Sequence, residues 1–215
     1  MTGVESLYPF LYSGDADLEA VLKEVRRSTE EKTAEIVALR REVVERYADE
    51  LVACAEAMAE RFDAGAKLFA FGNGGSSTDA QAVTTMFMAP GHGPRALPSI
   101  ALTGDVAVVT ALSNDIGFEV IFARQLAAFG RSGDIALGLS TSGGSANVIR
   151  GFEEAGRRGM LTVGLAGYDG GKMAELDTID HLFVVPSSSV HRIQEAQTTV
   201  YHVLWELTQQ ALAGR

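Results

Sequence analysis

The feature that most restricts the fold is a regular alternation of short apolar runs with helical segments after Lys67. The runs lack the polar alternation of a half-exposed strand, which indicates strands buried on both faces. Helical segments fit the gaps, at about 76–88, 105–112, 117–129, 145–157 and 189–211. Strands that alternate with helices predict a parallel sheet covered by helices on both sides. The expected strands are Lys67–Phe71, Ser99–Leu102, Ile135–Leu139, Leu161–Leu165 and His181–Val185.

The chain before this alternation is rich in strong helix formers. From residue 16 to about 64 we expect two helices, the second near Asp49–Phe62 and ending at Gly65. The predicted organisation is a helical extension of residues 1–64 followed by one α/β domain of residues 65–215. The extension is expected to pack on this domain or on a neighbouring subunit.

Charge and cysteine usage exclude several classes of function. The 18 Lys and Arg against 28 Asp and Glu give a net charge of −10, which argues against binding to nucleic acid or an anionic membrane. No apolar run approaches the roughly 18 residues of a membrane span, and the first residues do not form a secretory signal. We therefore expect a cytoplasmic protein. The single cysteine, Cys54, lies in a small-residue helical stretch and is expected to be buried packing rather than a nucleophile.

A glycine-rich loop follows the first expected strand and leads into a helix. It reads Gly72-Asn73-Gly74-Gly75-Ser76. Glycines let a ligand approach the main chain closely, and the following helix offers free N–H groups and a positive dipole end to an anion. The spacing fits neither the dinucleotide fingerprint nor the Walker motif, so this loop alone is a weak signal.

A second loop, after the third expected strand, carries hydroxyl groups. An ordinary helix N-cap needs a single Ser or Thr. Four hydroxyls around two glycines exceed that need, which favours a phosphate site without a cation. The four are Ser140, Thr141, Ser142 and Ser145.

Five segments follow one another in this chain as they do in bacterial phosphoheptose isomerases, and the chain therefore resembles that family of sugar-isomerase (SIS) domain proteins. They are GNGGS, SNDIGF, STSGGSANVI, GYDGGKMAE and RIQE, within about residues 67–207. The resemblance implies a three-layer α/β/α sandwich with a five-stranded parallel, flavodoxin-like sheet, and a homotetramer with active sites between subunits. It also implies conversion of sedoheptulose 7-phosphate to D-glycero-D-manno-heptose 7-phosphate at a site that binds zinc.

The resemblance also assigns roles to individual residues of this chain. His202 matches a histidine that ligates the metal and acts as acid and base, and Gln194, two helical turns earlier, matches a residue that contacts both substrate and metal. The serine-rich loop matches the phosphate-binding hydroxyls. The expected substrate-binding residues are Asn73, Gly74, Gly75, Ser76, Asn114, Asp115, Ser140, Thr141, Ser142, Ser145 and Gln194.

Two positions depart from the family pattern. After GNGGS the family carries a histidine and, four residues later, a glutamate that serve as metal ligands, and the glutamate is also the base. Here these positions read Ala82 and Met86. Neither side chain can ligate zinc or accept a proton at neutral pH, so we expect no cofactor and no family-type zinc. The base would then be His202 alone, or Asp115, Glu195 or His191 would take part; His191 stands where the family commonly has Asp.

Two functions remain open at this point. One is a phosphoheptose-isomerase-like enzyme with an altered acid and base set. The other is a non-catalytic sugar-phosphate sensor or scaffold, similar to the DnaA initiator-associating protein, which also lacks a full metal set. His202 has a second interpretation too, because it lies in the apolar stretch Val200–Trp205 and a lone histidine there is usually a core residue.

Overall fold

The computed structural model describes residues 18–214. Each strand expected from the sequence is present, with ends that differ by at most two residues. The elements in chain order are α2 (Leu18–Asp63), β1 (Leu68–Gly72), α3 (Gly75–Met88), β2 (Ser99–Ala101), α4 (Val106–Asp115), η2 (Phe118–Val120), α5 (Ile121–Phe129), β3 (Ile135–Ser140), α6 (Ala146–Arg157), β4 (Leu161–Gly167), η3 (Gly171–Glu175), β5 (His181–Val185) and α7 (Val190–Ala213).

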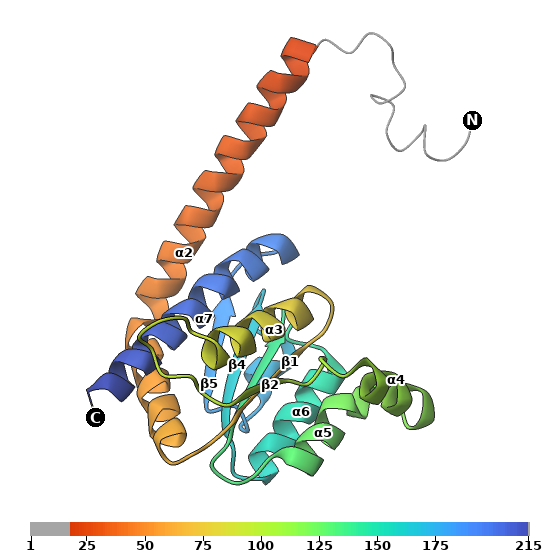
Figure 1. Ribbon diagram of the computed structural model, residues 1–215. Coiled ribbons are helices and arrows are strands. Elements are labelled where there is room, and N and C mark those ends of the chain that lie inside the picture. Colours follow the sequence, from red (N-terminus) through yellow and green to blue (C-terminus); the bar gives the residue numbers. More distant parts are fainter. Residues whose placement is uncertain (1–17, 215) are drawn as a thin grey trace. The chain divides into compact units, whose positions relative to one another are not determined.

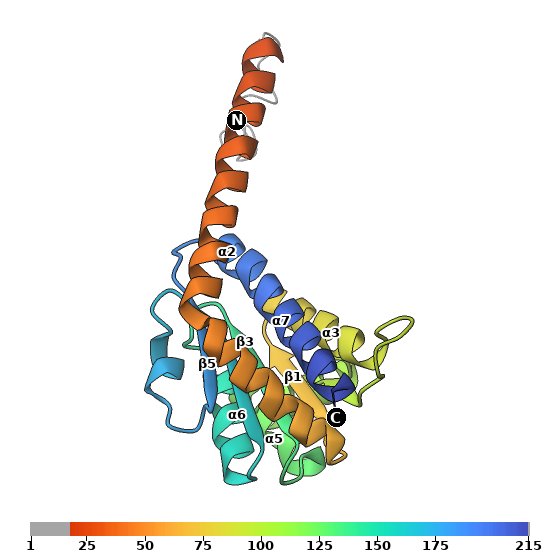
Figure 2. The same cartoon turned by 90° about the vertical axis from the view of Figure 1, so that its left-hand side faces the viewer.

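The strands of the described chain form one five-stranded parallel sheet in the order β2-β1-β3-β4-β5. Helices α3 and α7 cover one face, together with the second half of α2, and α5 and α6 cover the other (Figure 1; Figure 2). This confirms the expected three-layer α/β/α sandwich with a flavodoxin-like strand order. The chain leaves β1 toward β2 on one side and later returns to β3 on the other, so the loops after β1 and β3 diverge at a topological switch point.

Aromatic side chains fill the layer between the sheet and helices α5 and α6. The Phe71 ring lies 5.2 Å from that of Phe122 and 5.4 Å from that of Phe152, and all three are fully buried. A Cβ at Gly138 on β3 would lie 2.5 Å from the Phe152 ring, so this strand position must be glycine. Such contacts hold β1, β3 and α6 in fixed register beneath the loops that follow them.

The amino-terminal helix differs from the prediction. Residues 18–63 form one 46-residue helix rather than two, because no Gly or Pro stands between Leu18 and Asp63 to end it. Two compact units divide it: its residues from Leu39 onward belong with the rest of the domain, and residues 18–38 are described by themselves. Residues 1–17, the beginning of the expected extension, lie outside the described residues.

The second half of α2 is part of the core. Phe62 stacks on Phe87 of α3 at 5.6 Å, and the Tyr47 hydroxyl accepts a hydrogen bond from the Val184 backbone of β5 at 3.1 Å. Cys54 is fully buried, as expected, and burial raises the pKa of its thiol, which keeps it protonated and unreactive.

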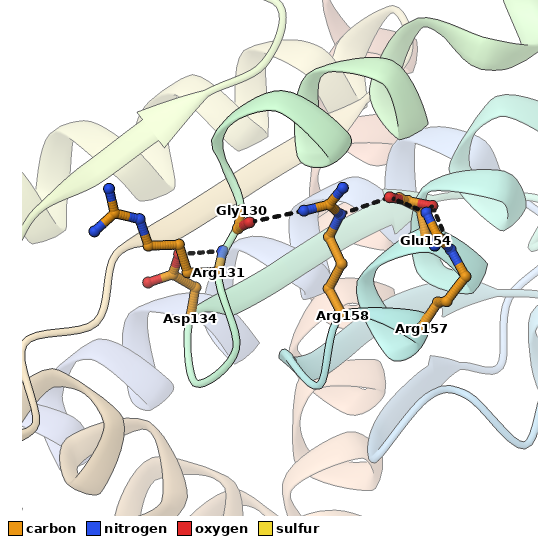
Figure 3. A network of polar contacts seen from close by, with 6 residues as sticks. All are labelled: Gly130, Arg131, Asp134, Glu154, Arg157 and Arg158. Carbon is orange, nitrogen blue, oxygen red and sulfur yellow. Dashed lines mark hydrogen bonds and ion pairs between the residues drawn. The ribbon is translucent and has the colours of Figure 1, made fainter.

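Polar side chains close the edge of the sheet where its strands begin (Figure 3). The buried Asp134 carboxylate accepts hydrogen bonds from the backbone amides of Lys67 and Arg131, at 2.8 and 2.9 Å. Arg158 donates to the Gly130 carbonyl at 3.1 Å and to Glu154 at 2.6 Å. This edge is therefore tied together by its own groups. None of the described helices has an apolar stretch that would span a bilayer.

Candidate phosphosugar site

The loop after β1 is shaped by its glycines. A Cβ at Gly72 would lie 2.7 Å from the Ser76 carbonyl oxygen and 2.9 Å from that of Leu139, so β1, its loop and β3 are in direct contact. Gly74 has φ 55°, a conformation that favours glycine, and it stands immediately before α3. No side chain caps this helix, and Ser76 is buried in its first turn.

An amide pair joins this loop to the helix that follows the second loop. Asn73 donates from Nδ2 to Asn147 Oδ1, and Asn147 donates back to Asn73 Oδ1, both at 2.8 Å. Asn147 is buried in the first turn of α6. The pair fixes the loops after β1 and β3 relative to each other, where the chain reverses direction across the sheet.

The second loop brings three of its hydroxyls together. The Ser140 and Ser145 Oγ atoms lie 3.0 Å apart, and the Ser140 and Ser142 Oγ atoms lie 3.5 Å apart. The Gly144 amide donates to Ser142 Oγ at 3.2 Å. Ser145 stands at the N-cap of α6, yet its side chain makes no capping bond. Its hydroxyl therefore faces the other serines instead of serving the helix, which argues against an ordinary cap.

A third loop, after β4, packs against the second. A Cβ at Gly143 (φ 62°) would overlap the Gly170 carbonyl, and the Met173 amide donates to the Gly143 carbonyl at 2.9 Å. An open cavity of 660 Å³ is lined by Ser142, Tyr168, Asp169, Pro186, Ser187 and Ser188. A second cavity, of 670 Å³, is lined in part by Gly144, Arg150 and Lys172. Residues of the serine loop thus line two cavities.

Helix α7 places the remaining expected residues. The Gln194 side chain packs directly on Gly75, where a Cβ would overlap its amide. His202 follows two turns later and is exposed, so it is not a core histidine; its Nδ1 lies 2.7 Å from the Thr198 carbonyl oxygen. His191 and Glu195 are also exposed on this helix.

Asn114 and Asp115 stand on α4, outside the three loops. They occupy the last turn of α4, where Asn114 Nδ2 donates to Asp115 Oδ1 at 2.8 Å, and both are exposed. Within the described part of the chain no hydrogen bond joins them to the other expected site residues.

Three residues near these loops were not identified from the sequence: Tyr168, Asp79 and Tyr201. Tyr168 has a φ of 54°, and among residues 18–214 it is the only residue other than glycine with a positive φ. Backbone strain of this kind is common at functional sites. Asp79, on α3, is half-buried and receives a hydrogen bond from the Tyr201 hydroxyl at 3.4 Å. Burial raises the pKa of the Asp79 carboxyl, and that hydrogen bond opposes the rise in part. The only signal for Asp79 in the sequence is its position four residues after Gly75.

The side chains of this site do not suit a zinc ion. On α3, Ala82 is exposed and Met86 is partly exposed, and they continue the face that begins with Gly75 and Asp79. Among residues 18–214, no three His, Cys, Asp or Glu side chains gather into a group that could hold a metal. Gln194 and His202 alone would supply one amide and one imidazole, fewer than the three or four ligands that zinc takes in proteins.

Comparison with known proteins now gives the class. A family model described as SIS domain matches residues 33–167. The chain is 44% identical over 177 residues to the phosphoheptose isomerase of Roseiflexus sp. (strain RS-1), which covers 82% of this chain and 89% of that protein. It is 42% identical over 199 residues to that of Aquifex aeolicus, covering 92% and 99%. The solved structure of phosphoheptose isomerase from Neisseria gonorrhoeae superposes with a TM-score of 0.80 at 34% identity, over 86% of this chain and 99% of that one.

These matches extend over nearly the whole length of the relatives. The fold and the loops at its switch point first define a SIS-domain protein. Within that class, the chain belongs to the phosphoheptose isomerase family.

Proposed function

We propose that this protein binds a phosphorylated sugar at the loops after β1 and β3 and interconverts its ketose and aldose forms without a metal. The proposed substrate is sedoheptulose 7-phosphate and the product D-glycero-D-manno-heptose 7-phosphate, as the family resemblance implies. The observation that carries the proposal is the hydroxyl cluster of Ser140, Ser142 and Ser145 at the switch point.

The chemistry of that cluster suits a phosphate group. Each hydroxyl can turn its proton toward a phosphate oxygen, and the first turn of α6 adds backbone N–H groups and the positive end of its dipole. When it binds a phosphate oxygen, Ser145 loses no capping hydrogen bond, because its side chain makes none. The Asn73 side chain, held by Asn147, stands at the adjoining loop to meet the sugar hydroxyls.

Zinc is not part of this proposal, since Ala82 and Met86 offer no ligands. His202 is then the proposed acid and base. The carbonyl oxygen of Thr198 can only accept a hydrogen bond, so the neighbouring Nδ1 of His202 must carry the proton. Nε2 is left with a lone pair on an exposed ring, which is the state that a general base needs.

The reaction would run through an enediol. His202 Nε2 takes a proton from C1 of the ketose; the C–H electron pair becomes the C1–C2 double bond, and the C2 carbonyl oxygen takes up the carbonyl π pair and a proton from water. The resulting hydroxide removes the proton of the C1 hydroxyl as the C1 carbonyl forms, and the C1–C2 π pair takes the proton back from His202 at C2. Each proton taken up is returned, so no oxidant or reductant is needed.

A homotetramer and a cytoplasmic location belong to the same proposal. The tetramer would bring a second subunit to Asn114 and Asp115, which within the described chain make no hydrogen bond to the other expected site residues. No partner other than the phosphorylated sugar is proposed, and neither nucleic acid nor a membrane is expected at a protein of net charge −10.

A second candidate is a sugar-phosphate sensor or scaffold that does no chemistry. Met86 favours it, because it stands at the family's base position and a positioned base contributes about 10²–10⁴-fold to rate. The phosphate-binding hydroxyls would then serve recognition alone.

Turnover of sedoheptulose 7-phosphate, followed by phosphorus and proton NMR with chelator present, separates the two candidates. Product formed by the wild-type protein and abolished in Ser142→Ala and His202→Ala supports the metal-independent isomerase. Binding that depends on Ser142 with no product, with or without zinc, supports the sensor. If the protein shows neither binding nor turnover, both candidate functions are wrong.

A further inference from the structure

Helices α3 and α7 meet along a short polar seam beside the glycine loop. Gly75 packs against Gln194. One turn further along α3, Asp79 Oδ1 lies 3.4 Å from the Tyr201 hydroxyl of α7. Gly75 and Asp79 are four residues apart on α3, and Gln194 and Tyr201 are seven apart on α7, so both pairs lie on the facing sides of the two helices.

The Tyr201 side chain is fixed at this seam. It is 3% exposed, and its hydroxyl lies 3.4 Å from Thr198 Oγ1 as well as from Asp79. Its ring stacks on the His202 imidazole, with centroids 5.0 Å apart and planes inclined by 26°. The immobile tyrosine therefore forms one wall against which the exposed histidine rests.

The seam is costly for folding. Asp79 Oδ2 is buried, and among the described residues it has no hydrogen-bond partner. A buried, unpartnered carboxylate oxygen lowers stability, and departures of this kind from a well-satisfied interior are expected at functional sites. A pair of helices packed for stability alone would place an apolar side chain at position 79.

We propose that Asp79 and Tyr201 are positioning residues for His202. Asp79 holds the Tyr201 hydroxyl, the Tyr201 ring holds the imidazole plane, and the Thr198 carbonyl keeps the proton on Nδ1 so that Nε2 faces the sugar. The inference rests on the proposed function, in which His202 works without a metal. Since Ala82 and Met86 supply no ligands, no ion orients the imidazole, and packing against Tyr201 takes over that task.

Three variants test this proposal. Tyr201→Phe removes the hydroxyl but keeps the ring, Asp79→Ala removes the acceptor, and Asp79→Asn retains an oxygen that can accept the Tyr201 bond. Tyr47→Phe is the matched control, because it also deletes a hydrogen-bonded tyrosine hydroxyl, on α2 and away from His202. Thermal unfolding and binding of sedoheptulose 7-phosphate establish that each variant is folded.

The first readout is the tautomer of His202, measured from the ring ¹⁵N shifts of labelled protein at one fixed pH. We expect Nδ1–H in the wild type, Tyr47→Phe and Asp79→Asn, and a mixture with Nε2–H in Tyr201→Phe and Asp79→Ala. The second is turnover: kcat should fall about tenfold in the latter two with KM unchanged, an effect of about 1.4 kcal/mol on the barrier.

The two readouts separate this proposal from the function on which it rests. A wild-type protein without turnover whose His202 tautomer still depends on Asp79 and Tyr201 overturns the isomerase and supports the positioning role. If folded Tyr201→Phe and Asp79→Ala keep the wild-type ¹⁵N shifts, the positioning role is wrong, whatever their kcat.

Discussion

The two edges of the sheet use polar side chains in opposite ways. Where the strands begin, the Asp134 carboxylate meets two backbone amides and Arg158 bridges Glu154 and the Gly130 carbonyl (Figure 3). Where the strands end, serine hydroxyls meet one another, Ser145 leaves its helix uncapped, and Asp79 keeps an unpartnered oxygen.

The difference shows how one sheet separates stability from binding. Bonds to backbone amides fix the chain and would be lost only on unfolding. Bonds between hydroxyls are weak and can be exchanged for bonds to an anion, which are about twice as strong. Substitutions at the amino edge should therefore change stability and leave binding intact, and those in the serine loop at the carboxyl edge should do the reverse.

The largest effect is expected for Asp134→Ala. It removes the two hydrogen bonds that the Asp134 carboxylate accepts from the Lys67 and Arg131 backbone amides, at about 2 kcal/mol for each bond to a charged group, so the free energy of unfolding should fall by about 4 kcal/mol. Denaturant titration measures this change. The matched variant is Asp169→Ala at the other edge, whose exposed carboxylate accepts a hydrogen bond from the Gly171 amide and should cost less than about 1 kcal/mol. Equal costs would remove the distinction between the edges.

Next is the gain of zinc by Ala82→His/Met86→Glu. The new pair would join Gln194 and His202 on the facing sides of α3 and α7. Binding should be about 100-fold tighter, or about 2.7 kcal/mol, than in Ala107→His/Ala111→Glu, which places the same pair on exposed positions of α4. Competition with a chromophoric chelator gives both affinities. Equal affinities would mean that α7 contributes no ligands.

A smaller effect separates two residues at helix starts. Ser145→Ala should weaken binding of sedoheptulose 7-phosphate about tenfold, or about 1.4 kcal/mol, with stability nearly unchanged because no cap is lost. Asp105→Ala should do the opposite, since Asp105 accepts from the Val108 amide and caps α4; its loss costs about 1 kcal/mol of stability. Calorimetry and denaturant titration together give the four values. A Ser145→Ala protein that loses stability but not affinity would return that serine to an ordinary cap.

Features that depend on local sequence signals could be predicted at both edges of the sheet. The strands and the serine loop were accessible because apolar runs and glycine spacing are local signals. The continuity of α2 differs from the two helices that the sequence predicts, although no Gly or Pro between Leu18 and Asp63 ends a helix.

The contacts between elements were not accessible in this way. The Asn73–Asn147 pair joins residues 74 positions apart, and the Tyr201–Asp79 bond joins residues 122 apart. Nothing in either local sequence specifies its partner, because the topology of the sheet brings them together. The exposure of His202 likewise depends on which face α7 turns to the core.

The smallest effect expected concerns Asp79 and pH. Burial raises its folded-state pKa above the value of 3.8 for an exposed carboxyl, so the folded protein holds a proton that the unfolded chain releases between those two pKa values. The free energy of unfolding should therefore decrease as pH rises through that window, and the charged carboxylate lowers stability at pH 7. Asp79→Asn should then be more stable than the wild type at pH 7, and the gain should shrink as pH falls toward 3.8. Gln81→Asn, on an exposed position of the same helix, controls for helix propensity and should show a difference independent of pH. A pH-independent loss in Asp79→Asn would instead mean that the Tyr201 hydrogen bond outweighs the cost of burying the charge.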